Sequence, residues 1–299
     1  MQLTGADVDL HVVENPKNFS IAGFAKLTRI GNLVIIALAQ YMTTAFLIAD
    51  STQLTSYLLS PRLFILSLSS VLIAASGYII NDYYDVKIDF LNKPERVVVG
   101  KVIKRRVVMV AHTLINFTGI ALGYLVLPIV ALVNFLSAVT LWWYSNRLKR
   151  LPLIGNLAVG LLTGLSIYIV ELVFQSGNKL VIIYAAFAFG YTVIREIVKD
   201  LEDVKGDEAF GCRTLPVVFG IQKTKNIIYA IMMIIAAALS WTLNQEWSSF
   251  NNMLTIGNLV MLIMLTIFLH RADTVKHFHQ LSSLTKLMML IGVFSMILS

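Results

Sequence analysis

The sequence predicts an all-α fold, a polytopic transmembrane bundle of about nine helices. Three observations support this fold class: the composition, the spacing of apolar segments, and the placement of basic residues along the chain. Of the 299 residues, 57% are hydrophobic and only 14% are charged, and the mean hydropathy is +0.76. A soluble protein of this length could not keep so much apolar surface away from water. The composition therefore excludes the soluble classes of protein.

Apolar segments close to the roughly 20 residues that cross a bilayer occur about nine times. The predicted spans are 28–48, 62–82, 107–126, 128–146, 153–175, 179–198, 226–244, 253–270 and 284–299. Residues 1–26 carry acidic residues before the first lysine and lack the pattern of a cleavable signal peptide. We expect 1–26 to form a cytoplasmic N-terminal tail and 27–299 to form one transmembrane domain.

The basic residues agree with this layout. If the N-terminus is inside, nine spans place every Lys and Arg except Arg62 and Lys179 at the inner face, where short loops normally collect them. We therefore expect an integral protein of the plasma membrane, with its N-terminus and active site on the cytoplasmic side. The net charge of +7 then faces anionic lipid head groups or a phosphorylated substrate, and we expect no nucleic-acid partner. Nothing in the sequence indicates an oligomeric state.

A first acidic cluster follows the second predicted span. If the helix continues past residue 82, Asn81, Asp85 and Asp89 recur every four residues, and Asp82 lies three residues before Asp85. Four oxygen-bearing side chains then share one broad helix face. Like charges at this spacing repel each other, so the pattern predicts a bound cation.

A second acidic cluster follows the sixth predicted span, where Asp200, Asp203 and Asp207 also share one face. Carboxylate and amide oxygens without a neighbouring His or Cys cluster favour a hard ion, and Mg²⁺ fits best. The alternative interpretation is that both clusters are helix ends solvated by water. Two such clusters facing the same compartment favour the metal interpretation.

Basic residues adjoin both acidic clusters. They are Lys87, Lys93 and Arg96 after the first, and Arg195, Lys199, Lys205 and Arg213 around the second. Carboxylates that hold Mg²⁺, next to cations that hold phosphate oxygens, are the groups a site needs to bind and ionise a diphosphate. Retention of positive charge at the inner leaflet would also explain many of the bases.

At these residues the sequence resembles the UbiA superfamily of intramembrane prenyltransferases. The first family motif, Asn-Asp-x-x-Asp-x-x-x-Asp, is matched by Asn81, Asp82, Asp85 and Asp89, and the second by Asp203 and Asp207. Further matches are Arg29, Asn32, residues 92–96, Tyr144 to Lys149, and Gly155-Asn156.

The resemblance implies a helical bundle around a central cavity, in which Mg²⁺ holds the diphosphate of a polyprenyl donor whose tail lies among membrane lipids. The implied metal ligands and catalytic carboxylates are Asp82, Asp85, Asp89, Asp203 and Asp207. The implied substrate-binding residues are Asn81, Arg29, Asn32, Lys93, Arg96, Lys149, Lys199 and Asp200. Tyr144 is either a catalytic aromatic that stabilises the allylic cation or an interfacial aromatic beside Trp142 and Trp143.

The stretch from Lys93 to Arg96 resembles the branch of the family that contains digeranylgeranylglyceryl phosphate synthases. A geranylgeranyl donor and the acceptor geranylgeranylglyceryl phosphate are therefore our first expectation. An aromatic quinone precursor, of the 4-hydroxybenzoate, dihydroxynaphthoate or homogentisate type, is the competing acceptor. A transporter of divalent cations or pyrophosphate is the alternative from another class, but it would place ionisable groups near the middle of the membrane.

Overall fold

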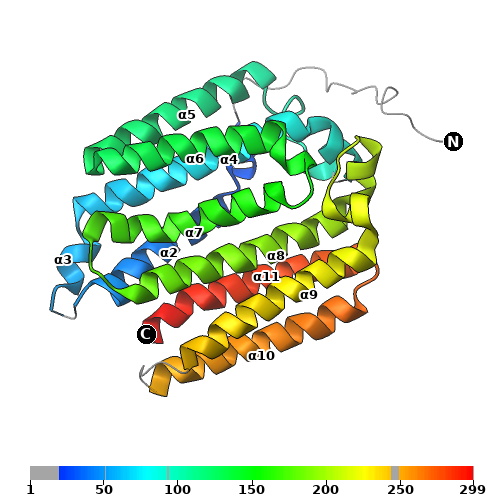
Figure 1. The fold of residues 1–299 in the computed structure, drawn as a ribbon. Coiled ribbons are helices and arrows are strands. Elements are labelled where there is room, and N and C mark those ends of the chain that lie inside the picture. The colour runs from blue at the N-terminus through cyan, green and yellow to red at the C-terminus, as the bar shows by residue number, and fades with distance from the viewer. Residues whose placement is uncertain (1–19, 51, 93, 244–248, 299) are drawn as a thin grey trace. The chain divides into compact units, whose positions relative to one another are not determined.

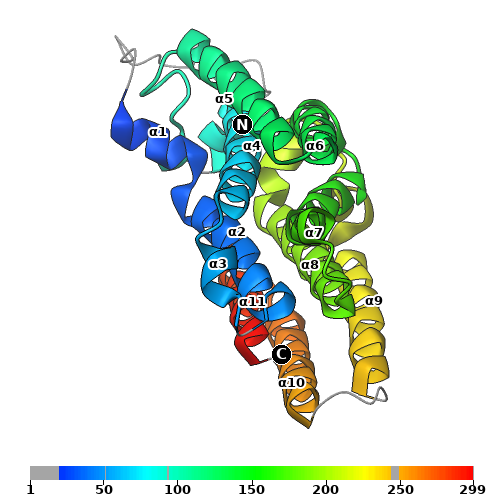
Figure 2. The same cartoon turned by 90° about the vertical axis from the view of Figure 1, so that its left-hand side faces the viewer.

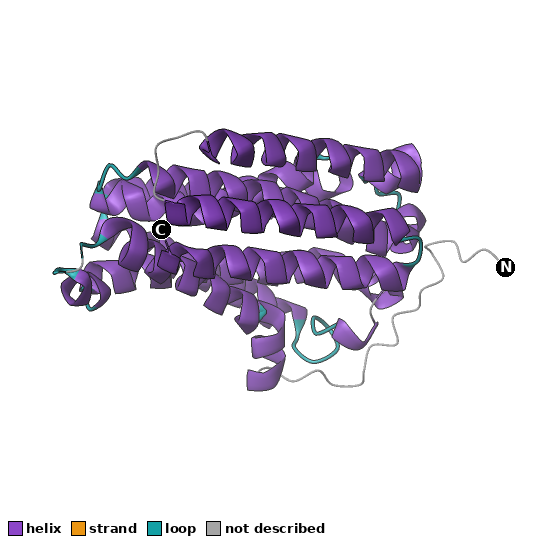
Figure 3. Cartoon of the chain, turned by 90° about the horizontal axis from the view of Figure 1, so that it is seen from below, coloured by secondary structure: helices purple, strands orange, loops and turns teal. Residues whose placement is uncertain are grey.

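All regular secondary structure in the described residues is helical, as Figure 3 shows by colour. The computed structural model describes residues 20–50, 52–92, 94–243 and 249–298. Most of the expected N-terminal tail, 1–26, lies outside the described residues. Within them, seven helices are long and apolar enough to cross a membrane. The predicted all-α membrane fold is confirmed.

Contacts divide the chain into two compact units, and each is described by itself. The first unit comprises Met1–Ala37, Ser60–Leu151 and Lys205–Arg213, and the second comprises Leu38–Leu59, Pro152–Val204 and Thr214–Ser299. Two helices, α2 (Ile30–Thr43) and α8 (Lys179–Ala209), contribute residues to both units.

The first unit is built on three long helices that pack against one another (Figure 1). Its helical elements outside α2 and α8 are α1 (Ile21–Thr28), α4 (Pro61–Asn92), η2 (Pro94–Arg96), α5 (Arg105–Val126), α6 (Pro128–Asn146) and η3 (Leu148–Arg150). A closed polar network joins α5 to α4: a His112 ring nitrogen lies 3.0 Å from the Ser76 carbonyl oxygen, and the Ser76 hydroxyl donates to Asn116 Oδ1 over 2.5 Å. Interhelical hydrogen bonds of this kind stabilise helix pairs in membranes.

The second unit contains the remaining helices. They are η1 (Thr44–Ile48), α3 (Leu54–Leu58), α7 (Ile154–Phe174), α9 (Leu215–Leu243), α10 (Ser249–Arg271), α11 (Val275–Ser295) and η4 (Met296–Leu298). In Figure 2, α7 and α8 run side by side. Their close approach depends on small residues, because a Cβ on Gly164 would lie 2.8 Å from the Ala185 carbonyl oxygen.

Eight of the nine predicted spans lie mainly on one helix each, whereas the span 28–48 includes the end of α1, the break at Arg29, α2 and η1 (Thr44–Ile48). The span 128–146 coincides with α6. The span 62–82 ends too early, because α4 continues to Asn92 and carries the whole first acidic motif. The span 179–198 also ends too early, since α8 continues to Ala209. The predicted spans are too short because hydropathy shows only where a helix leaves the hydrocarbon core of the membrane. The helix itself continues until its backbone hydrogen bonding stops.

The predicted span 226–244 begins too late. The helix α9 starts at Leu215 and includes a break at Gly220, whose φ of 79° and ψ of 166° are not helical. Glycine takes this positive φ without steric cost, which lets the chain turn between two helical segments. The predicted span 253–270 lies on α10, and the span 284–299 covers the end of α11 and η4. Asn244 and Ser299, the last residues of two predicted spans, lie outside the described residues.

Candidate active site

The first acidic motif lies on the last turns of α4, in the first unit. Arg29 Nη2 lies 2.8 Å from Asp82 Oδ1, and Lys149 Nζ forms an ion pair with Asp85. Asn81 Nδ2 donates to the other Asp85 oxygen over 2.8 Å. The two aspartate side chains are only 15% and 13% exposed. Charges so little exposed interact strongly, since water screens them poorly.

Arg29 reaches Asp82 from a break between two helices. It follows the last residue of α1 and has φ 53°, in the left-handed region that non-glycine residues seldom adopt. Its guanidinium also lies 5.0 Å from the centre of the Tyr78 ring, within cation–π range. The ion pair with Asp82 and the contact with Tyr78 thus hold a backbone conformation that costs about 1 kcal/mol.

The other predicted residues of α2, α4 and α6 occupy the same unit. Asp89 lies one turn beyond Asp85 and is close enough to interact electrostatically with Asp85 and Asp82. The Asn32 backbone N–H donates to the Arg29 carbonyl over 2.8 Å. Tyr144 lies on the last turn of α6 and is partly buried.

The last aspartate of the second motif belongs to this unit as well. After α8 ends, the Arg213 backbone N–H donates to the Arg150 carbonyl over 2.8 Å, which ties the segment to η3. The Cys212 backbone N–H donates to the Asp207 carbonyl over 2.8 Å. The segment that carries Asp207 is thus fixed beside the residues that follow α6.

The environment of Cys212 shows which charges this segment approaches. Burial, together with the carboxylates of Asp207 and Asp85, raises the pKa of the Cys212 thiol to about 11, although Arg150 and Lys149 act in the opposite direction. Asp207, Asp85 and Lys149 therefore lie near enough to the Cys212 thiol to affect its pKa. Sequence separation alone does not indicate this proximity.

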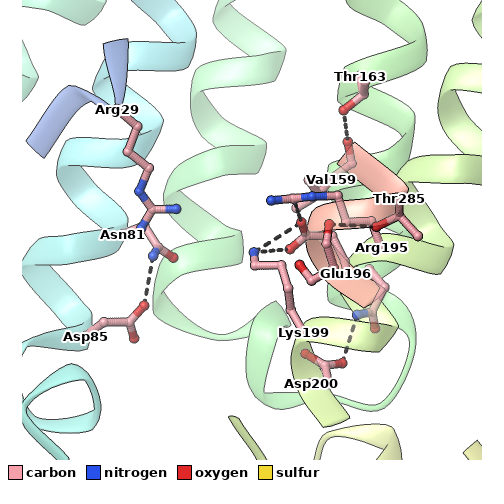
Figure 4. Close-up of polar contacts among 12 residues, drawn as sticks. Arg29, Asn81, Asp85, Val159, Thr163, Arg195, Glu196, Lys199, Asp200 and Thr285 are labelled. Atoms are coloured by element: carbon pink, nitrogen blue, oxygen red, sulfur yellow. Dashed lines mark hydrogen bonds and ion pairs between the residues drawn. The ribbon is translucent and has the colours of Figure 1, made fainter. Parts of the chain in front are cut away.

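The rest of the second motif lies in the second unit. Asp200 Oδ2 accepts a hydrogen bond from Asn156 Nδ2 over 2.8 Å, so α7 supports α8 at this point. Lys199 Nζ lies 2.8 Å from Glu196 Oε2, and Arg195 Nη1 lies 2.8 Å from Glu196 Oε1 (Figure 4). Asp203 is partly buried one turn further along the helix.

Our prediction from sequence gave no role to Glu196 or Asn156. Two features of the sequence indicate them: Glu196 lies four residues before Asp200, and Asn156 lies at the start of α7. Lys93 lies outside the described residues. Arg96 ends η2, and the stretch before it is anchored by Lys26 Nζ, which donates to the Glu95 carbonyl over 2.5 Å.

The carboxylate and amide oxygens of the two acidic motifs are suited to a hard cation. Among the described residues, no three His, Cys, Asp or Glu side chains converge closely enough to form a metal cage on their own. Mg²⁺ does not need such a cage, since it commonly uses one or two carboxylates together with water and phosphate oxygens. Asn81 Oδ1 is buried and has no hydrogen-bond partner within the described residues, and a buried oxygen of this kind is suited to a cation or a donor group of a ligand.

Comparison with known proteins gives consistent matches. The model of the UbiA prenyltransferase family matches residues 35–289. The digeranylgeranylglyceryl phosphate synthase of Sulfolobus acidocaldarius is 33% identical over 276 residues, covering 90% of this chain and 94% of the relative. The enzyme of the same name from Methanoculleus marisnigri is 34% identical over 233 residues, covering 77% of this chain and 80% of the relative.

Solved structures share the fold. A UbiA homologue from Archaeoglobus fulgidus bound to DMAPP and Mg²⁺ superposes with a TM-score of 0.68 at 18% identity, covering 92% of this chain and 99% of that one. A digeranylgeranylglyceryl phosphate synthase structure gives a TM-score of 0.67 at 21% identity, covering 92% and 96%.

Proposed function

The chain belongs to the UbiA prenyltransferase family, and from this premise we propose that it transfers a geranylgeranyl group from its diphosphate to geranylgeranylglyceryl phosphate in the membrane. The observation that carries the choice of acceptor is the match to the Sulfolobus acidocaldarius synthase, which extends over 94% of that enzyme. The family match includes residues of both units. This supports our proposal that 27–299 acts as one prenyltransferase domain.

We place the N-terminus and the site on the cytoplasmic side of the plasma membrane. The support is the charge pattern, since Arg62 and Lys179 are the basic residues at the opposite ends of the spans. Both substrates are amphiphilic, with anionic groups that would meet these bases and apolar chains that would remain among lipids.

The residues that would hold Mg²⁺ are the carboxylates of both motifs, Asp82, Asp85, Asp89, Asp203 and Asp207, with Asn81 Oδ1 as a further oxygen. Bound Mg²⁺ would neutralise the negative charge that the leaving diphosphate acquires. Arg29 and Lys149 hold Asp82 and Asp85 in place, and substrate phosphate oxygens would compete with these carboxylates for the same cations. When the donor binds, Arg29 and Lys149 can thus exchange their ion pairs with Asp82 and Asp85 for charge-assisted hydrogen bonds to the diphosphate.

The reaction requires heterolysis of the allylic carbon–oxygen bond. The bonding electrons leave with the diphosphate, and the cations Lys149, Lys199, Lys93 and Arg96 are our candidates to stabilise that charge. The acceptor hydroxyl then forms the new carbon–oxygen bond to the allylic carbon and releases its proton. Fixed charges stabilise this redistribution more effectively in a poorly hydrated site than in water.

The experiment that tests the proposal is product analysis with purified protein. The protein is incubated with geranylgeranyl diphosphate, Mg²⁺, and an equimolar mixture of geranylgeranylglyceryl phosphate and 4-hydroxybenzoate, with a chelator in the control. We expect mass spectrometry to find the digeranylgeranyl ether lipid, and only with Mg²⁺. A prenylated aromatic acid as the main product would contradict the acceptor, and the absence of any prenylated product with donors of several lengths would contradict the transfer.

A further inference from the structure

The carboxylate of Glu196, on α8 in the second unit, holds two cations at once. Lys199 Nζ lies 2.8 Å from its Oε2 and 3.1 Å from its Oε1, and Arg195 Nη1 lies 2.8 Å from Oε1. Figure 4 shows these contacts. Glu196 is buried. The proposed binding of Mg²⁺ and donor leaves this buried carboxylate without a function.

The three side chains differ in their access to a ligand. The Lys199 side chain is 29% exposed and that of Arg195 is 22% exposed, whereas that of Glu196 is only 9% exposed. Lysine also carries its ammonium on a flexible four-carbon stem. Lys199 is therefore the member of the cluster that can change its partner, while the carboxylate itself stays out of reach of a ligand.

The position of Lys199 along α8 places it next to the second acidic motif. Asp203 follows Lys199 by four residues, so the two share one face of the helix and lie about 6 Å apart along its axis. Glu196 precedes Lys199 by three residues. Lys199 thus lies between the buried carboxylate and a proposed Mg²⁺ ligand, where the diphosphate held by that Mg²⁺ would come within its reach.

Exchange of partners by Lys199 does not leave the buried carboxylate alone. Arg195 contacts Glu196 independently of Lys199, and a buried carboxylate that keeps one cation costs much less free energy than an unpaired one. The contact of Lys199 with a carboxylate and its contact with a phosphate are both charge-assisted hydrogen bonds. The two states of Lys199 are therefore close in free energy, as reversible binding of an anion requires.

We propose that Glu196 competes with the diphosphate for Lys199 and so weakens the binding of pyrophosphate enough for this product to leave after each transfer. This inference rests on the proposed function, in which pyrophosphate is the leaving group. Lys199 pairs with Glu196 in the empty site and turns to the phosphate oxygens when the donor binds. Its return to Glu196 offsets part of the free energy that is lost when pyrophosphate leaves.

The test compares Glu196→Gln with the matched control Glu208→Gln, an exposed glutamate on the same helix. Binding of inorganic pyrophosphate with Mg²⁺ is measured on the full chain in phosphatidylcholine nanodiscs. Glutamine keeps the shape of Glu196 but not its charge, so we expect the Kd in Glu196→Gln to fall at least about tenfold, or about 1.4 kcal/mol. The control should bind as the wild type does. In turnover, Glu196→Gln should lower both the KM of the donor and kcat, because the product leaves more slowly.

A double variant shows whether Glu196 acts through Lys199. In a Lys199→Met background, Glu196→Gln should change the Kd of pyrophosphate little, because the shared partner is gone. An equal gain of affinity in both backgrounds would overturn the inference, since loss of negative charge alone would then explain it. Unchanged or weaker binding in the single variant Glu196→Gln would also overturn it.

A second variant covers the case in which Glu196→Gln does not fold. Glu196→Asp keeps the charge but shortens the side chain by one methylene, which weakens its hold on Lys199. We expect this variant to melt close to the wild type and to bind pyrophosphate about threefold more tightly. An unchanged Kd in the folded Glu196→Asp protein would overturn the inference.

The binding measurement needs no acceptor, so it separates this inference from the proposed function. If the wild type forms no prenylated product while Glu196→Gln still tightens pyrophosphate binding, the proposed function fails and the competition for Lys199 stands. If product forms and pyrophosphate binds equally to the wild type and Glu196→Gln, the inference fails and the proposed function stands.

Discussion

At the residue scale, the pairing of acids with bases explains how the first acidic cluster is tolerated at a membrane boundary. Asp82 pairs with Arg29, and Asp85 pairs with Lys149 and Asn81. The acidic motif itself could be predicted from sequence, because its spacing is regular. The identity of the pairing cations could not, since Arg29 is separated from Asp82 by 53 positions and Lys149 from Asp85 by 64.

The first prediction concerns Asp85, which contacts Lys149 and Asn81. We expect Asp85→Asn to lower kcat at least about 100-fold while the protein remains extractable and folded, because a metal ligand close to the developing charge is removed. The measurement is turnover against Mg²⁺ concentration. Asp50→Asn, an exposed site in the second unit, is the matched control and should behave as the wild type. Full activity in Asp85→Asn would remove this residue from the metal site.

The second prediction concerns the ion pair of Lys225 and Asp273. Lys225 is buried, with 3% of its side chain exposed, and its Nζ lies 2.9 Å from the Asp273 carboxylate. The hydrogen bond from Lys225, and then its charge, lower the pKa of Asp273 below the ordinary value. A carboxyl whose pKa is lowered by folding stabilises the protein at neutral pH, and this contribution is lost as the pH falls through the folded-state pKa.

We therefore expect Asp273→Asn to lower the melting temperature by a few degrees at neutral pH, in the range of about 2–4 °C. The difference from wild type should shrink as the pH falls below the ordinary pKa of an aspartate, and it should vanish once the pH is below the lowered pKa of Asp273 in the folded protein. Thermal unfolding in detergent across a pH series measures both effects. A difference that stays constant down to the lowest pH would show that the ion pair does not cause it.

At the scale of elements, the apolar segments of the sequence locate the helices more accurately than they locate the helix ends. The span 128–146 agrees with α6 because Pro128 fixes its first turn and the apolar run ends with the helix. In α4 and α8 the helix continues into charged residues, since acids and bases on successive turns pair with neighbouring elements and do not interrupt the backbone. Extended helix ends of this kind carry most of the candidate site.

The third prediction tests the contact between α7 and α8. A Cβ on Gly164 would lie 2.8 Å from the Ala185 carbonyl oxygen, a backbone atom that cannot rotate away. We expect Gly164→Ala to destabilise the protein by about 1–3 kcal/mol and Gly164→Leu to abolish the folded yield. Size-exclusion profiles and melting curves in detergent are the measurements. Gly257→Ala on α10, where a Cβ would meet nothing within 4 Å, is the control and should be neutral or slightly stabilising.

At the scale of the whole molecule, one property of the sequence, its uneven charge, predicts both the membrane topology and the class of substrate. The basic residues mark one end of the spans, and the two acidic motifs follow spans that end there. The family match over residues 35–289 agrees with that prediction of function. The hydrogen bond from Asn156 to Asp200 could not be predicted, because it joins α7 to α8 and only the fold brings the two side chains together.

The last prediction follows from the proposed orientation. In a Cys212→Ser background, single cysteines replace Lys101, between η2 and α5, and Lys179, at the start of α8. Both positions are exposed, and Cys212 is the only native cysteine, so labelling reports each introduced thiol alone. A membrane-impermeant maleimide should label Lys179→Cys in intact cells and Lys101→Cys only after permeabilisation, because short basic loops stay on the cytoplasmic side. The reverse pattern would place the acidic motifs outside the cell, where no cytoplasmic prenyl diphosphate could reach them, and would contradict the proposed cytoplasmic site.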